Sequence, residues 1–252
     1  LFYDPVLMEP EDSVYTAEDG SYGIDISPGL YTITWSKEGY APFELTGYPI
    51  SDNTVLEDVT LFPGSLQEVA GEVSGNWPSG NVFVVTGDIV IPDGDTLTID
   101  GGVMVRFDTG TGMVCNGTLR ANGTEDEHVL FTSNQSIPAV GDWDNIELYG
   151  QNNILTYVDY EYSADGFTGD GCNGTTFDHL NMVETLGLAA NGIYLTNSIN
   201  VTFTNNTIFV YGEYGIFSEN SSGSIVSGNS ISWSHAQAAI RLDYCDNCEF
   251  DS

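Results

Sequence analysis

Hydrophobic and polar residues alternate in short runs through most of the chain. In the clearest example, Ile193 and Leu195 form one alternating pair and Val201 and Phe203 a second, with Thr and Ser interspersed and Asn or Gly at the ends of each run. Alternation over short runs bounded by turn residues is typical of β-strands that have one buried face. The pattern predicts many short strands, and it contains too many turns for pairs of helices.

The alternating pattern recurs at a nearly fixed spacing. Gly192 aligns with Gly215 and Ile193 with Ile216, a period of 215 − 192 = 23 residues, and a weaker third copy places Ile240 a further 240 − 216 = 24 residues on. A period between about 20 and 50 residues is characteristic of solenoids. Stacked turns bury a shared apolar column and pair their strands in parallel. We therefore predict a parallel β-helix.

The repeat also carries a resemblance to a known family. One copy reads Gly-Ile-Tyr-Leu-x-Asn-Ser-x-Asn-Val-Thr-x-Thr-Asn-Asn-Thr-Ile, which resembles the repeats of right-handed, pectin-lyase-like β-helices, especially the Asn-rich versions on archaeal and bacterial surface proteins. From residue 81, the order Ile-Pro-x-Gly, Thr-Leu-Thr-Ile and Gly-x-x-Val-x-Phe is similar to the opening of many secreted β-helices.

The resemblance implies an all-β, right-handed parallel β-helix over residues 81–252. With 252 − 80 = 172 residues at about 23 per rung, roughly seven rungs are expected. The family includes lyases, hydrolases, epimerases, adhesins and surface-layer proteins. Membership would therefore leave the function open.

Residues 1–64 follow a different pattern, with three motifs in a fixed order. They are Asp19-Gly-Ser-Tyr22, Pro28-Gly-Leu-Tyr31 and Gly39-Tyr40, with an alternating run after the Pro-Gly turn. These motifs resemble those of carboxypeptidase regulatory-like, transthyretin-related domains. The resemblance implies a small β-sandwich over residues 1–64, followed by a junction rich in Gly, Ser and Pro at residues 65–80.

Both ends of the chain are expected to be open. The sandwich family usually begins with an earlier strand, and Leu1-Phe2-Tyr3-Asp4 starts too late to contain all of it. We expect either that this strand belongs to a longer chain, or that another chain supplies it by strand addition to an open edge. No cap follows Asp251. We expect the chain to continue there, or the last rung to dock end-on against a neighbour.

The formal net charge of −33 limits the partners. There are 37 acidic residues and only four basic ones, Lys37, Arg106, Arg120 and Arg241. Such a surface repels nucleic acid and anionic lipid, which are therefore not expected as partners. Calcium is the candidate cofactor, and solubility in salty surroundings is the alternative explanation of the charge. The carboxylates lack an EF-hand spacing and are scattered over loops: Asp93, Asp95, Asp108, Asp142, Asp144, Asp165 and Asp170.

The four cysteines favour a local disulfide. Cys245 and Cys248 have the spacing of a CxxC pair, but no second pair or paired His completes a zinc site. A disulfide at a corner is the preferred interpretation, with unpaired buried thiols and metal or redox chemistry as alternatives. Cys115 and Cys172 can pair only if their rungs are neighbours.

Seven Asn-x-Ser/Thr sequons are candidate N-glycosylation sites. An Asn-, Ser- and Thr-rich solenoid also generates such triplets for structural reasons. The seven asparagines are Asn116, Asn122, Asn134, Asn173, Asn200, Asn205 and Asn220.

No known catalytic constellation is recognised. β-Helix lyases need a basic residue to take a proton, and of the arginines only Arg241 lies in the late rungs. No nucleophile elbow, phosphate loop or dinucleotide fingerprint occurs. Glycoside hydrolases need clustered carboxylates, and the nearest cluster is explained equally well by a solvated face. That cluster is Asp159, Glu161, Asp165 and Asp170. The three histidines are expected at surface or turn positions: His128, His179 and His235.

The sequence therefore predicts a non-catalytic extracellular protein. We expect a rigid module of a cell-surface filament, surface layer or adhesin that self-associates end to end and contacts surface glycans. No apolar run approaches the roughly 20 residues of a membrane helix. The alternative is a carbohydrate-binding or carbohydrate-active, glycoside hydrolase-like β-helix, in which carboxylates and aromatic residues converge in one groove. Its candidate aromatic residues are Trp143, Tyr149, Tyr157, Tyr160 and Tyr162.

Overall fold

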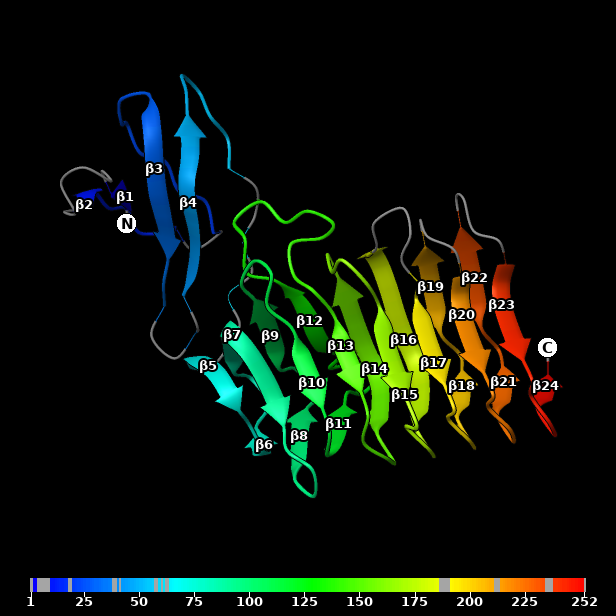
Figure 1. Ribbon diagram of the computed structural model, residues 1–252. Coiled ribbons are helices and arrows are strands. Elements are labelled where there is room, and N and C mark those ends of the chain that lie inside the picture. The colour runs from blue at the N-terminus through cyan, green and yellow to red at the C-terminus, as the bar shows by residue number, and fades with distance from the viewer. Residues whose placement is uncertain are drawn as a thin grey trace. The chain divides into compact units, whose positions relative to one another are not determined.

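The computed structural model describes the chain as two compact units, Leu1–Ser65 and Leu66–Ser252 (Figure 1). All regular secondary structure of the described residues is β-strand, which confirms the all-β class. The described residues are all except 1, 4–9, 18–19, 38–39, 41, 57–58, 60, 62–63, 186–190, 211–213, 234–237 and 252.

The first unit contains one antiparallel sheet in its described part. Its order is β2-β1-β3-β4, and Tyr31 and Ile33 of β3 are its buried core. Partly buried residues such as Ile24 and Leu56 pack against this pair. The described strands do not include a second sheet, so the sandwich stays a prediction. The strands are β1 (Phe2–Tyr3), β2 (Pro10–Asp12), β3 (Gly29–Trp35) and β4 (Phe43–Ile50).

The second unit is a parallel β-helix of about seven turns, with three faces that we call A, B and C (Figure 1). The chain passes from A to B to C in each turn, and each strand pairs with its equivalents in the turns before and after it. Face A consists of β5 (Leu66–Glu72), β7 (Val82–Ile91), β9 (Met104–Phe107), β12 (Val129–Ser133), β14 (Ile154–Glu161), β16 (Thr176–Thr185), β19 (Thr207–Val210) and β22 (Ser230–Trp233).

Faces B and C complete each turn, and four long strands bend around a corner to belong to two faces. Face B takes the ends of β5 and β7, then β10 (Met113–Cys115), β13 (Ile146–Leu148), β15 (Phe167–Asp170), β17 (Ile193–Thr196), β20 (Tyr214–Glu219) and β23 (Ala238–Asp243). Face C takes β6 (Gly75–Trp77), β8 (Thr96–Asp100), β11 (Thr118–Asn122), the first halves of β14 and β16, β18 (Thr202–Thr204), β21 (Ile225–Ser227) and β24 (Glu249–Asp251).

The strand register confirms the predicted period. Ile193 pairs with Ile216 and Ile216 with Ile240, as the sequence alignment of the repeats required. Ile208 pairs with Ile231 on face A. Each of these pairs places an apolar side chain above its equivalent in the previous turn.

The β-helix begins earlier than expected. The segment at residues 65–80, interpreted as a junction, contains β5 and β6, which pair in parallel with β7 and β8. Trp77 explains the early start, because its buried ring stacks on Phe83 with centroids 4.0 Å apart and closes the apolar column.

Stacked side chains fill the interior from turn to turn. On face C, the rings of Phe177 and Phe203 lie parallel, with centroids 5.6 Å apart and planes 2° apart. Val226 and Leu155 continue this column on either side. Interiors of this density lose about 3–5 kcal/mol when a Phe is replaced by Ala. The column is therefore the main source of stability in this unit.

Glycine is required where turns approach most closely. A Cβ atom at Gly192 would overlap the backbone oxygen of Gly215 in the next turn. Gly192→Ala should therefore destabilise the β-helix by at least about 1–3 kcal/mol, as overpacking in an interior does. Urea unfolding measures the change. Gly87→Ala is the matched control, since its Cβ would lie 3.5 Å from Ala70, and equal losses for both variants would contradict the close approach.

Candidate functional site

A column of unusual residues lines the corner between faces C and A, which we call the C–A corner. Tyr157, His179 and Asn205 occupy equivalent places in successive turns, with φ of 47°, 54° and 55°. Gly228 follows in the next turn with φ of 63°. Left-handed backbone is natural for Gly and tolerated by Asn, whereas a Tyr or His there is uncommon. The surrounding contacts must hold these two in place.

Stacked rings provide part of that support. Tyr157 lies against His179, with ring centroids 4.3 Å apart and planes 15° apart. His128, one turn earlier, lies 5.6 Å from Tyr157 between ring centroids. The His128 ring is tilted by 48° to the Tyr157 ring, so the three rings form an exterior row in which only Tyr157 and His179 are stacked.

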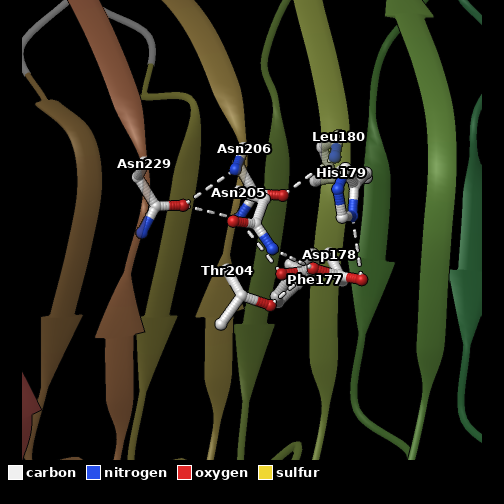
Figure 2. A network of polar contacts seen from close by, with 8 residues as sticks. All are labelled: Phe177, Asp178, His179, Leu180, Thr204, Asn205, Asn206 and Asn229. Carbon is white, nitrogen blue, oxygen red and sulfur yellow. Dashed lines mark hydrogen bonds and ion pairs between the residues drawn. The ribbon is translucent and has the colours of Figure 1, made fainter. Parts of the chain in front are cut away.

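Asp178 ties two turns together beside this stack (Figure 2). One of its oxygens, Oδ1, accepts hydrogen bonds from Thr204 Oγ1 at 2.6 Å and Asn205 Nδ2 at 3.1 Å. The other, Oδ2, lies 3.0 Å from His179 Nδ1. Burial alone would raise the pKa of Asp178, but the bonds from Thr204, His179 and Asn205 together lower it. The carboxylate is therefore held in its ionised form.

A second pair of His and Asp lies on the A side of the corner. His128 Nδ1 is 3.0 Å from Asp159 Oδ2, and Asn181 Nδ2 donates to Asp159 Oδ1 at 2.9 Å. The side chains of His128 and Asp159 are 34% and 26% exposed, and those of the His179–Asp178 pair are 38% and 26% exposed, so both pairs are partly open to solvent. A His oriented by a carboxylate is the arrangement of a general base. Within the described residues, however, no hydrogen bond joins a nucleophile to either imidazole.

Inside the same corner, buried asparagines satisfy the backbone (Figure 2). Asn206 Oδ1 accepts the Leu180 amide proton at 2.9 Å, and its Nδ2 donates to Phe177 O at 3.0 Å and Asn229 Oδ1 at 2.8 Å. Asn229 repeats the pattern by donating to Phe203 O at 2.8 Å. An unsatisfied buried amide costs about 1–3 kcal/mol, so this ladder stabilises the corner.

The outer side of face B carries a second exterior column, which we call the face B strip. It contains Glu147, Thr168, Tyr194, Phe217 and Arg241 in successive turns. The Tyr194 and Phe217 rings are stacked, with centroids 4.9 Å apart and planes 9° apart. The guanidinium carbon of Arg241 lies 5.4 Å from the Phe217 centroid.

Carboxylates lie in the face B strip and beside it. Tyr149, 47% exposed, donates its hydroxyl to Glu147 Oε2 at 2.7 Å. Asp170 accepts bonds from Asn197 Nδ2 at 2.6 Å and Thr196 Oγ1 at 2.8 Å, which lower its pKa. Aromatic rings, carboxylates and hydroxyls therefore lie together on this face.

The other candidate aromatic and acidic residues are dispersed. Trp143 and Tyr160 are fully buried core residues and cannot stack on a ligand. Asp159 and Glu161 lie on face A and Asp170 on face B, so the acidic cluster seen in the sequence does not converge. Sequence reasoning missed the stacking of Tyr157 on His179 and the contact of His128 with Tyr157, because both depend on the register between turns. His235 lies outside the described residues.

The cysteines occupy two environments. Cys245 and Cys248 form a disulfide in the last turn, with Cα atoms 6.0 Å apart. Cys115 and Cys172 are free and buried. Burial raises the pKa of Cys115 to about 12 and also raises that of Cys172. Neither thiol is activated for chemistry.

The loop carboxylates do not form a metal site in the described part of the chain. There, no three His, Cys, Asp or Glu side chains gather closely enough to hold a metal ion. Burial raises the pKa of Asp165, while N–H groups of Asn191 and Gly166 act in the opposite direction. Asp108 and Asp142 instead accept local bonds from Asn134 and Ser133. No helix in the described ranges has the length and apolar character of a membrane span.

One hollow is found in the first unit. It is lined by residues 20–27 and 50–56 and contains the carboxylates Asp25 and Asp52. Its lining includes no His, Cys, Lys or Arg.

Comparisons with known proteins identify similarity within the β-helix. A family model described as a pectate-lyase like beta helix domain matches residues 71–185. Protein bark beetle of Drosophila melanogaster is 30% identical over 103 residues, which cover 38% of this chain and 3% of the fly protein. The match thus spans only a small part of that relative. No solved structure matches the chain significantly.

Asp178 should make stability depend on pH. Its folded pKa lies below the usual 3.8, so its stabilisation is present above that value and is lost as the pH falls through the folded pKa. Asp178→Asn should cost about 1 kcal/mol at pH 7. Urea unfolding at several pH values should show this difference shrinking in acid. Asp126→Asn, on an exposed loop, is the control, and a difference that persists unchanged at low pH would contradict the role of the carboxylate.

The buried thiols should resist alkylation. With its pKa near 12, Cys115 has almost no thiolate at pH 8, and Cys172 is shifted in the same direction. We expect iodoacetamide to modify neither in the folded protein and both in urea, as measured by intact mass. Rapid labelling of the folded chain would show that these residues are not in the solenoid core.

Proposed function

We propose that this chain is a non-catalytic extracellular structural protein, a rigid module of a cell-surface filament, surface layer or adhesin. The observation that supports it best is the uninterrupted parallel stack from β5 to β24, whose side-chain ladders link each turn to the next. The side chains that donate to the two aspartates are Asn181, Thr204 and Asn205. Among the described residues, no hydrogen bond joins a nucleophile to either imidazole. In this proposal the solenoid supplies shape and stiffness.

Assembly in this proposal proceeds end to end through strand-edge contacts. Wherever such a stack ends without a cap, the strands of the last turn would offer unpaired N–H and C=O groups to another chain. The charge of −33 opposes contact between copies, and salt or divalent cations screen that repulsion. Calcium enters the proposal as such a counterion, and surface glycans as further contacts.

Salt should therefore control self-association. We expect the protein to be monomeric at low ionic strength and to form longer particles as NaCl rises to about 1 M, where the Debye length is near 3 Å. Light scattering and sedimentation velocity follow the change. CaCl₂ is compared with NaCl at the same ionic strength. Stronger association in CaCl₂ would indicate specific calcium binding, and equal association would indicate screening alone. Monomers under every condition would contradict assembly by this chain alone.

The alternative is a carbohydrate-binding or carbohydrate-active β-helix. The face B strip favours it. The small Thr168 pairs with Tyr194 from the preceding turn, and carboxylates lie on the same face at Glu147, which pairs with Thr168, and at Asp170. An aromatic face beside hydroxyls and carboxylates suits a neutral sugar, whereas a uronate would be repelled.

A matched pair of variants tests this alternative. If the strip binds sugar, Tyr194→Ala should weaken retention on an insoluble neutral polysaccharide at least 10-fold, because a stacking contact is lost. Tyr244→Ala is the control, since Tyr244 is 80% exposed and outside the strip. Equal retention of both variants, or no retention of the native chain, removes the alternative.

A further inference from the structure

The fold sorts the seven sequon asparagines into two groups. In this solenoid, Asn has two structural uses: it adopts left-handed backbone at corners, and its amide links neighbouring turns. A sequon whose Asn serves either purpose is explained by the fold. A sequon whose Asn serves neither requires another explanation.

Five of the seven are explained. Asn200, Asn205 and Asn220 have left-handed φ of 56°, 55° and 53°. Asn205 Nδ2 also donates to Asp178 at 3.1 Å, and Asn220 Nδ2 to Asn197 Oδ1 at 3.3 Å. The remaining two bond through side-chain atoms: Asn134 Nδ2 donates to Asp108 at 2.7 Å, and Asn173 Oδ1 accepts from Ile199 N at 2.8 Å.

Asn116 and Asn122 serve neither purpose. Both are exposed and neither has left-handed backbone. Among the residues that the structure describes, no side-chain hydrogen bond links either amide to a neighbouring turn. Asn116 follows β10 and Asn122 ends β11, so both lie in one turn at the two ends of its face C strand. Their amides are free to take the orientation that a substituent requires.

The residues after them also favour an acceptor role. A Cβ at Gly117 would overlap the backbone oxygens of Pro92 and Asp95, and one at Gly123 the oxygen of Tyr157. Glycine is thus required at the middle position of both sequons, while the preceding position tolerates any exposed residue. Asn at that free position, with Thr two residues later in both cases, is what an N-glycosylation signal needs.

We propose that the folded, exported protein carries N-linked glycans at Asn116 and Asn122 and leaves the other five sequons bare. The donor is a lipid-linked oligosaccharide. The Asn Nδ2 atom attacks the anomeric carbon, the bond from that carbon to the lipid pyrophosphate oxygen breaks, and the amide nitrogen loses one proton as the C–N bond forms. No oxidation or reduction occurs. This inference rests on the export that the proposed function assumes, and not on assembly.

Confining glycans to one turn has a structural consequence. The substituents would project beside β11 and leave the ladders of β16 to β24 unobstructed. In the other sequons, a sugar on Asn205 or Asn220 would replace a hydrogen on a nitrogen that bonds the neighbouring turn. Placement at Asn116 and Asn122 therefore adds polar bulk without disturbing contacts between turns.

Glycopeptide mass spectrometry tests the proposal. The full chain, with a secretion signal, is produced in a eukaryotic secretory host, and the secreted folded fraction is analysed. We expect glycans at Asn116 and Asn122, loss of one glycan in Asn116→Gln and in Asn122→Gln, and none in the double variant. Thr124→Ser preserves the sequon and should keep its glycan.

A structural sequon provides the control. Asn205→Gln should leave the glycan mass unchanged and lower the melting temperature, whereas Asn116→Gln should not change the melting temperature of the enzymatically deglycosylated protein. The inference would be overturned if the secreted chain carried no glycan. It would also be overturned if the glycans lay mainly at the other five sequons: Asn134, Asn173, Asn200, Asn205 and Asn220. Salt-dependent assembly of that unmodified chain would leave the proposed function standing.

Discussion

Each turn of the β-helix must bend the chain at its corners while keeping the backbone within about 4.8 Å of the next turn. This constraint explains most of the unusual residues. Where turns nearly touch, only glycine fits, as at Gly192 and Gly215. Where the chain bends with positive φ, Asn and Gly predominate, and the Tyr157 and His179 rings are held by stacking on each other.

The same constraint gives part of the acidic surface a structural role. Corner N–H and side-chain amide groups need acceptors, and carboxylates supply them from the neighbouring turn. Asp178 accepts from Thr204 and Asn205, and Asp170 from Thr196 and Asn197. These bonds lower the pKa of both carboxyl groups. Both groups are ionised at neutral pH, where their charge opposes close contact between copies. Stability within the chain and repulsion between chains thus arise from the same residues.

Much of the solenoid could be predicted because its late turns are nearly equal in length. Ile193, Ile216 and Ile240 align in the sequence at 23 and 24 residues and pair in the structure. The earlier turns contain insertions, so equivalent residues are unevenly spaced: 157 − 128 = 29 from His128 to Tyr157, and 179 − 157 = 22 to His179. The ring stack could not be found without that register. Strand β5 was missed because its residues are mostly exposed and show no alternation. The alternating sequence pattern also did not indicate which tyrosines face the interior, and Tyr160 is buried whereas Tyr149 is exposed.

Electron microscopy of the native material tests the central claim most directly. If the solenoid is a structural module, the particles should be filaments or sheets in which rods with a repeat of about 4.8 Å between strands join end to end. Discrete particles without end contacts, in material taken directly from the cell surface, would contradict the account and favour a binding or catalytic role for the face B strip.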